Sequence, residues 1–213
     1  MANDPSTYSG LVTSVANWLN RTDLSTTEIP EAIALAERRF QRLVFCPERE
    51  VNTTLTATAA TVALPSDFWG MKSVYADLAT KIVLQQVTRE QLDALFPSTT
   101  TGNVSYFAIE GENMLLGPTP SDSTDLIMTY YQTIPALNSS DTTNWLLTDH
   151  PDLYMWGALA ELHVLLRDTE GMQIFEAKMR NVLDDVNRSG RDRHFAGPLY
   201  ATTQIPNVRN VQA

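Results

Sequence analysis

The sequence predicts an α+β protein: a helical bundle built from N- and C-terminal helices, with an inserted antiparallel β domain and an extended C-terminal arm. Three observations predict this fold. Apolar residues recur at helical spacing near both ends of the chain, they alternate with polar residues through much of the middle, and periodicity stops near residue 190. The expected division is 1–50 plus 135–190 for the bundle, 51–134 for the β domain and 191–213 for the arm.

Two helices are expected before residue 50. Apolar residues between Tyr8 and Leu19 recur at helical spacing, and Ser6 or Thr7 is placed to cap the first turn. A second apolar stripe runs from Ile29 to Leu43. Pro47 then ends this helix, because proline cannot donate the backbone hydrogen bond that a helix needs.

The pattern changes to period two at Val51. Leu55 and Ala57 alternate with threonines, and a short turn separates them from Val62 and Leu64, which predicts a hairpin over 51–64 with a threonine-rich exposed face. Further strands are expected at Met71–Asp77, Ile82–Val87, Tyr106–Glu110, Met114–Leu116 and Leu126–Gln132. Between these strands, 88–96 has the signature of a short helix with a capping box, and 97–104 is a polar loop.

The C-terminal part begins with a long loop, Pro135–Asp149, and continues into the most hydrophobic segment of the chain. Leu153–Leu166 leaves few polar positions, so a central helix covered on most sides is expected. Asp168 or Thr169 caps a partner helix whose apolar stripe ends at Val186. Because the joint between the two helices is short, they should form an antiparallel hairpin.

The composition is that of a folded protein, with 43% hydrophobic and 19% charged residues. No apolar run approaches the roughly 18 residues that cross a bilayer, and the N-terminus lacks the pattern of a signal peptide, so synthesis in a cytoplasm and no membrane partner are expected. The net charge of −10 is uneven: residues 187–213 carry four arginines and one aspartate, a net +3, which leaves −13 for residues 1–186. Such a split suits self-association or docking on an acidic partner.

The search for catalytic chemistry predicts no catalytic, cofactor-binding or metal-binding residues. Cys46 is alone and follows an apolar helix, which favours a buried structural thiol. His163 has no second ligand four residues on, and His150 suits helix capping at least as well as proton transfer. Glu110 and Glu112 resemble a glycosidase carboxylate pair only in spacing, since the intervening glycine indicates a turn between solvated acids.

Several segments together resemble one protein family, the head–tail adaptors of tailed bacteriophages and prophages. They occur in the expected order over almost the whole chain: the stretch from Tyr8-Ser-Gly-Leu-Val to Leu24, Ile29-Pro30 leading into Ala34–Phe40, Ala63-Leu-Pro-Ser-Asp-Phe68, Val87-Thr-Arg-Glu-Gln-Leu92, Thr129–Pro135, and Asn144-Trp-Leu-Leu-Thr-Asp-His-Pro-Asp-Leu-Tyr154. Each motif is weak by itself, whereas the ordered set is fairly specific. Two departures are an apolar Leu43–Cys46 where a basic run is expected, and a segment after Gly190 that matches no motif.

The resemblance implies a structural virion protein rather than an enzyme. It implies a ring, commonly of twelve subunits, bound beneath the portal protein at the head–tail junction. Such a ring extends the DNA channel, so that DNA passes through without specific binding during genome ejection, and offers a platform to tail nozzle or tail fibre proteins. Neighbouring copies of the chain and the portal are therefore the expected partners, and no cofactor is implied.

The arm is the predicted binding site for the portal or a neighbouring subunit. Arginines and a few large apolar residues order on a partner more readily than they fold alone. The residues concerned are Arg188, Arg191, Arg193, His194, Phe195, Leu199, Tyr200, Ile205 and Arg209. Three alternatives stay open at this point: another connector or tail component such as a stopper or nozzle subunit, a carbohydrate-acting enzyme using acids of the β domain, and a cytoplasmic binding module.

Overall fold

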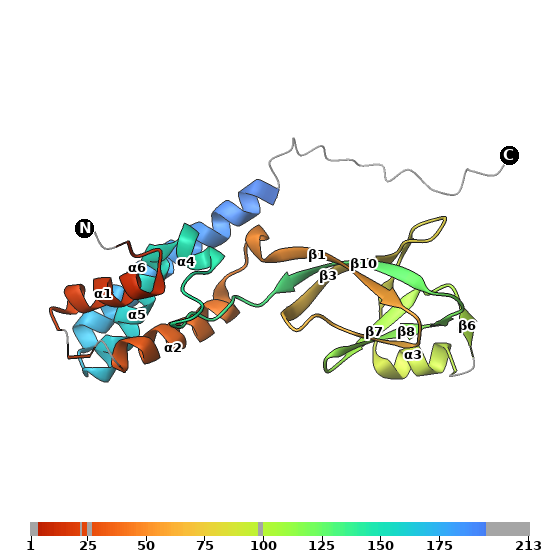
Figure 1. Ribbon diagram of the computed structural model, residues 1–213, viewed down its shortest axis with the longest axis horizontal. Coiled ribbons are helices and arrows are strands. Elements are labelled where there is room, and N and C mark those ends of the chain that lie inside the picture. Colours follow the sequence, from red (N-terminus) through yellow and green to blue (C-terminus); the bar gives the residue numbers. More distant parts are fainter. Residues whose placement is uncertain (1–3, 22, 25–26, 98–99, 195–213) are drawn as a thin grey trace.

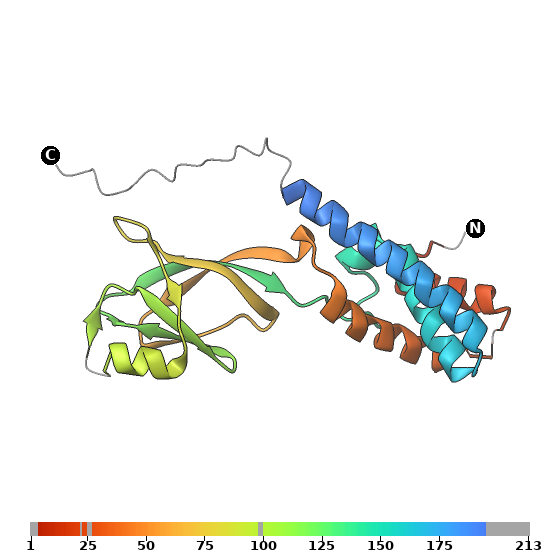
Figure 2. The same cartoon turned by 180° about the vertical axis from the view of Figure 1, so that it is seen from behind.

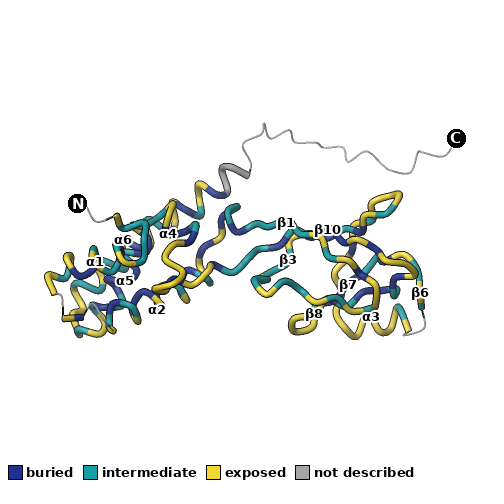
Figure 3. The backbone as a smooth tube through the Cα atoms, in the orientation of Figure 1, coloured by how far each residue is buried: buried dark blue, intermediate teal, exposed yellow. Residues whose placement is uncertain are grey.

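The chain folds into an elongated molecule with helices at one end and strands at the other, as the computed structural model shows in Figures 1 and 2. The structure describes residues 4–21, 23–24, 27–97 and 100–194, with side chains as far as Gly190. Buried apolar residues form two separate clusters, one among the helices and one among the strands (Figure 3). We call these two ends the helical part and the β part.

The helical part contains five α-helices drawn from both ends of the chain: α1 (Tyr8–Leu19), α2 (Glu28–Leu43), α4 (Trp145–Asp149), α5 (Pro151–Leu165) and α6 (Thr169–His194). Thr7 is the residue that caps α1, and its hydroxyl accepts a hydrogen bond from the N–H of Gly10 at 3.2 Å. The expected central position of α5 is confirmed, since Leu153, Leu159 and Leu162 are fully buried.

Two expectations about this part are wrong. The loop predicted over Pro135–Asp149 contains the short helix α4, whose first turn is capped by Asn144. The arm was expected to begin at residue 191, but α6 continues through Gly190 to His194. The expectation rested on apolar periodicity, which stops near residue 190, whereas the helix itself continues, and Gly190 is buried against Cys46 and Pro47, where a side chain would not fit.

The β part contains two four-stranded sheets, one two-stranded sheet and one short helix. The first sheet has the order β1-β10-β3-β4, all antiparallel, and the second has the order β2-β8-β7-β5. The only parallel pairs among the described residues, β5 with β7 and β6 with β9, are two residues long. The bounds are β1 (Glu50–Ala57), β2 (Thr61–Ala63), β3 (Phe68–Ala76), β4 (Ile82–Val83), β5 (Gln85–Gln86), α3 (Arg89–Leu95), β6 (Thr101–Gly102), β7 (Tyr106–Glu110), β8 (Asn113–Gly117), β9 (Thr119–Pro120) and β10 (Thr124–Gln132).

The strand pattern at Val51 was predicted correctly, but its pairing was not. Asn52, Thr54 and Thr56 form the exposed face, as expected. The predicted hairpin is wrong, because β1 pairs with β10 and β2 pairs with β8 in the other sheet. The strand predicted at Ile82–Val87 likewise divides into β4 and β5, one in each sheet. Local alternation does not reveal which distant strand supplies the hydrogen bonds.

The α+β fold class is confirmed, with helices from both chain ends and largely antiparallel strands between them. The capping box of α3 is also confirmed. The Thr88 hydroxyl accepts from the N–H of Gln91, and the Gln91 side chain accepts from the N–H of Thr88. None of the helices in the described ranges is long and apolar enough to cross a membrane.

Candidate interaction surfaces

The described residues offer little to a catalytic site. No group of three or more His, Cys, Asp or Glu side chains among them is arranged to hold a metal ion. Burial, together with a hydrogen bond to Glu48, raises the pKa of the Cys46 thiol to about 12, so this thiol is protonated at neutral pH and the interpretation as a buried structural cysteine is confirmed. His163 contacts Asp168 at 2.9 Å, at the turn that joins α5 to α6.

The paired acids of the β part are solvent-exposed turn residues. Glu110 and Glu112 flank Gly111, which has a φ of +59° in the turn between β7 and β8. Glu110 forms an ion pair with Arg89 of α3. An exposed carboxylate lacks the buried, apolar surroundings that are typical of a general acid.

A buried arginine joins the two parts of the molecule. Arg49 lies in a single 3-10 turn, Pro47–Arg49, between α2 and β1, and its side chain is fully buried. Its guanidinium donates to the carbonyl of Gln132 at the end of β10 (3.0 Å) and to the carbonyls of Gln41 (3.2 Å) and Val44 (2.8 Å) at the end of α2. Burial lowers the pKa of Arg49 from its ordinary value, yet guanidinium stays charged in proteins. The Arg49 guanidinium therefore caps the C-terminal end of α2 and is hydrogen-bonded to the end of β10.

A second arginine ties three helices of the bundle together. Arg39 of α2 donates to Glu161 of α5 at 2.8 Å and to both carboxylate oxygens of Glu176 of α6 at 2.8 Å. Burial raises the pKa of Glu176, but hydrogen bonds from Arg39 and Arg180 outweigh it, so the pKa lies below the ordinary value. The forked guanidinium suits this geometry because it presents several donors in one plane.

Exposed aromatic side chains occur at the far end of the bundle and at the junction. Trp18 is 54% exposed, and its ring forms a T-shaped contact with Trp156 in which the ring centroids are 5.0 Å apart. Near the Arg49 turn, Phe45 is 51% exposed and packs against Trp69, whose ring lies 4.5 Å from the Arg49 guanidinium carbon. Exposed aromatic groups of this size are typical of contact surfaces.

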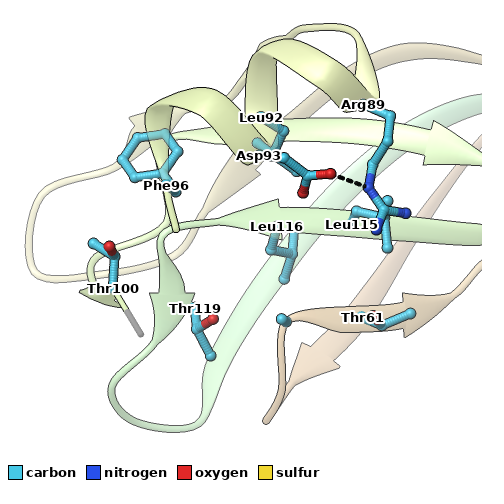
Figure 4. Close-up of a pocket in the computed structure, with 10 residues that line it drawn as sticks. Thr61, Arg89, Leu92, Asp93, Phe96, Thr100, Leu115, Leu116 and Thr119 are labelled. Atoms are coloured by element: carbon cyan, nitrogen blue, oxygen red, sulfur yellow. Dashed lines mark hydrogen bonds and ion pairs between the residues drawn. The ribbon is translucent and has the colours of Figure 1, made fainter. Parts of the chain in front are cut away.

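A cavity of about 370 Å³ lies between α3 and the second sheet (Figure 4). Leu92 of α3, Phe96 directly after α3 and Leu116 of β8 supply apolar lining, and the ion pair between Arg89 and Asp93 lies at the edge of the cavity. The lining combines these apolar groups with threonines and holds no histidine or cysteine. Sequence patterns gave no sign of this cavity, because it forms between elements that are distant in the chain.

The predicted arm residues fall into three groups. Arg188 is exposed on α6, and Arg191, Arg193 and His194 belong to the last turn of that helix. Phe195, Leu199, Tyr200, Ile205 and Arg209 lie outside the described residues. The end of α6 lies beside the junction, since a Cβ atom at Gly190 would meet Cys46 and Pro47. Gly190, near the end of α6, therefore packs against the turn that connects α2 to β1.

Two folded parts share a narrow junction built around Arg49, and exposed aromatic side chains flank this junction. An arrangement of this kind is typical of a subunit that binds other proteins.

The family follows from comparison with known proteins. Residues 6–202 match the SU10 adaptor protein family, and the chain belongs to this family of phage head–tail adaptors. Membership makes the chain a component of the virion that interacts with other head and tail proteins. Among curated proteins, none matches the chain.

Proposed function

We propose that twelve copies of this chain form a ring beneath the portal, where the ring extends the DNA channel and carries tail nozzle or tail fibre proteins. The observation that carries the proposal is the family match, which covers residues 6–202 and so includes both the helical part and the β part. A subunit built from two folded parts can present one part to the head and the other to the tail. The proposed domains are a helical domain of 1–50 with the stretch from 135 to the end of α6, a β domain of 51–134, and the arm that follows α6.

The charge distribution supports a conduit for DNA. The net charge of −13 on residues 1–186 repels phosphates, and DNA-binding proteins make their phosphate contacts through Lys and Arg. We propose that part of this negative charge lines the channel. Acids that a particle reconstruction places on the channel wall, changed to lysine, should slow DNA ejection, whereas matched changes on the outer wall should not. Equal ejection rates for both sets would contradict the acidic lining.

The basic C-terminal end supports a grip on a partner. Arg188 is exposed, and the three other arginines of this region follow it within 21 residues. Basic residues beside apolar ones bind an acidic or apolar partner surface at the moment the segment orders. The portal and the neighbouring copy are the proposed partners of this arm.

The test is assembly on purified portal rings. The full chain mixed with portal should give a complex whose mass, measured by light scattering, corresponds to the portal plus a ring of this chain. A chain cut after His194 should fold with an unchanged circular dichroism spectrum but bind at least tenfold more weakly. Full binding by the truncated chain would show that the arm is not the anchor. Density for this chain at a stopper or nozzle position in a particle reconstruction would overturn the adaptor proposal.

A further inference from the structure

Strand β1 is a long and unprotected edge of the first sheet. Proteins guard exposed sheet edges with very short strands, bulges or charged residues, because a free edge pairs with other chains. The opposite edge follows this rule: β4 has two residues, and the part of β3 beyond it carries Lys72 and two irregularities in its register with β10. The edges of the second sheet, β2 and β5, have three and two residues. In contrast, β1 has eight residues in unbroken register, and its only charged residue, Glu50, is the first.

The hydrogen bonds of the sheet show which peptide groups of β1 face outward. The N–H of Asp77 donates to the carbonyl of Asp125 at 2.8 Å, so the peptide group of Asp125 points toward β3. Because successive residues of a strand alternate, Leu126 points toward β1, where it lies opposite Leu55. Thr54 and Thr56 therefore direct their N–H and carbonyl groups away from β10. No backbone hydrogen bond within the described ranges reaches these groups from the open side.

The inner face of β1 is also incomplete. Val51, Thr53 and Leu55 point toward the core of the β part but are only partly buried. On the neighbouring strand β10, Leu126 and Met128 are fully buried. The difference arises because β10 has a strand on each side and β1 has one. A further strand at this edge would pair the free peptide groups and bury the rest of Val51 and Leu55 together.

The chain contains a segment suited to this place. Leu199–Ile205 is an uncharged run of seven residues with the composition of a strand, and it is bounded by Pro198 and Pro206. Leu199, Ala201, Thr203 and Ile205 share one face of a strand, while Tyr200, Thr202 and Gln204 share the other. The first set matches the apolar inner face of β1, and the second matches its polar outer face. Pro206 ends the pairing because it lacks a backbone N–H.

We propose that the open edge of β1 binds Leu199–Ile205 of a neighbouring copy as an added β-strand. The proposal rests on the proposed ring, and it names the surface that receives the arm. Donor and acceptor are different surfaces of one chain, which is the head-to-tail relation that closes a ring, whereas pairing of two β1 edges would give a two-fold dimer. Only residues 195–198 separate α6 from the segment, so the five Cα–Cα steps from His194 to Leu199 span at most about 18 Å. A short connection that contains a proline favours exchange between copies.

Disulfide trapping in the assembled complex tests this pairing. Copies carrying Thr54→Cys are mixed with copies carrying Tyr200→Cys, Thr202→Cys or Gln204→Cys, assembled on portal rings and oxidised. At least one mixture should give an intermolecular disulfide on a non-reducing gel. Ser73→Cys is the matched control, because it is exposed on the same sheet but lies on β3, two strands from β1, and should give none. The native Cys46 is buried and does not interfere.

Chains that carry both cysteines show whether the added strand comes from the same copy or from a neighbouring copy. An intramolecular disulfide in these double variants would show that the segment pairs with its own β1 and would overturn the exchange between copies. A ring of the expected mass with no Thr54 disulfide would overturn the edge pairing and leave the ring intact. A chain that stays monomeric even with portal present would overturn the proposed ring, and this pairing with it.

A proline pair provides a second readout. Thr54→Pro removes an N–H that faces the open edge, so the fold should be kept while the association between copies weakens at least tenfold. Thr53→Pro removes an N–H that pairs with β10 and should lower the melting temperature of the isolated chain. Unchanged association by the Thr54→Pro chain, at an unchanged melting temperature, would count against the added strand.

Discussion

Replacing Arg49 with methionine should destabilise the protein and loosen the junction between its two parts. Methionine keeps much of the volume of the side chain but removes the guanidinium, which donates to the carbonyls of Gln132, Gln41 and Val44. It also removes the contact of this cation with the Trp69 ring. The last carbonyls of α2 and the end of β10 would then lack a shared donor.

The magnitude follows from two opposing terms. Each hydrogen bond from a charged donor contributes about 1.5–3 kcal/mol, while burying a guanidinium costs several kcal/mol. The cost is larger here because Nη2 of Arg49 finds no hydrogen-bond partner among the described residues. Subtracting the cost of burial from the contribution of the three hydrogen bonds leaves a loss of about 2–4 kcal/mol in the free energy of unfolding for Arg49→Met. For a chain of this size, that loss lowers the melting temperature by roughly 5–15 °C.

Urea unfolding and small-angle X-ray scattering together measure the effect. Arg89→Met is the matched control, because both of its ion pairs are solvent-exposed and exposed ion pairs add little to stability. The Arg49 variant should unfold at lower urea, and its scattering should show a larger radius of gyration as the two parts move relative to each other. If the Arg49→Met and Arg89→Met chains unfold at the same urea concentration and scatter alike, Arg49 does not hold the junction.

Three further outcomes follow from the packing. Gly157→Ala should lower the free energy of unfolding by about 1–3 kcal/mol despite the better helix propensity of alanine, because the new methyl group would lie 2.5 Å from the Phe40 ring of α2. Gly70→Ala is the control, since a methyl group there meets open space and should leave the urea unfolding curve nearly unchanged. Equal losses in the two variants would contradict the close packing at Gly157. Glu176→Gln should flatten the acid limb of the stability–pH curve. The lowered pKa of Glu176 in the folded state adds stability that is fully present above the unfolded-state pKa near 4.3 and is lost as pH falls through the folded-state pKa. If the variant keeps the same loss of stability at acid pH, the ion pair of Glu176 with Arg39 is not the cause of that loss. Thr88→Ala should lower the free energy of unfolding by about 1 kcal/mol, because the α3 cap is lost. An unchanged urea midpoint would show that this cap does not contribute to stability.

The sequence alone determined those local structures that depend on neighbouring residues and on the spacing of apolar side chains. The stripes of α1, α2 and α5, the capping box at Thr88 and the buried Cys46 were all predicted, because each depends on residues within a turn or two of one another. The family was identified by the same route, since its motifs are local and their order is read along the chain.

Tertiary structure alone decided the pairing of strands and the end of the last helix. A period-two pattern at Val51 does not tell whether β1 pairs with its sequence neighbour or with β10, whose paired residues lie 67 to 81 positions away, because both choices bury the same face. Apolar periodicity ends near residue 190, yet α6 extends to His194, and Gly190 packs against Pro47, a contact that the sequence pattern does not reveal. The role of Arg49 was hidden for the same reason, since its carbonyl partners belong to elements that only the folded chain brings together.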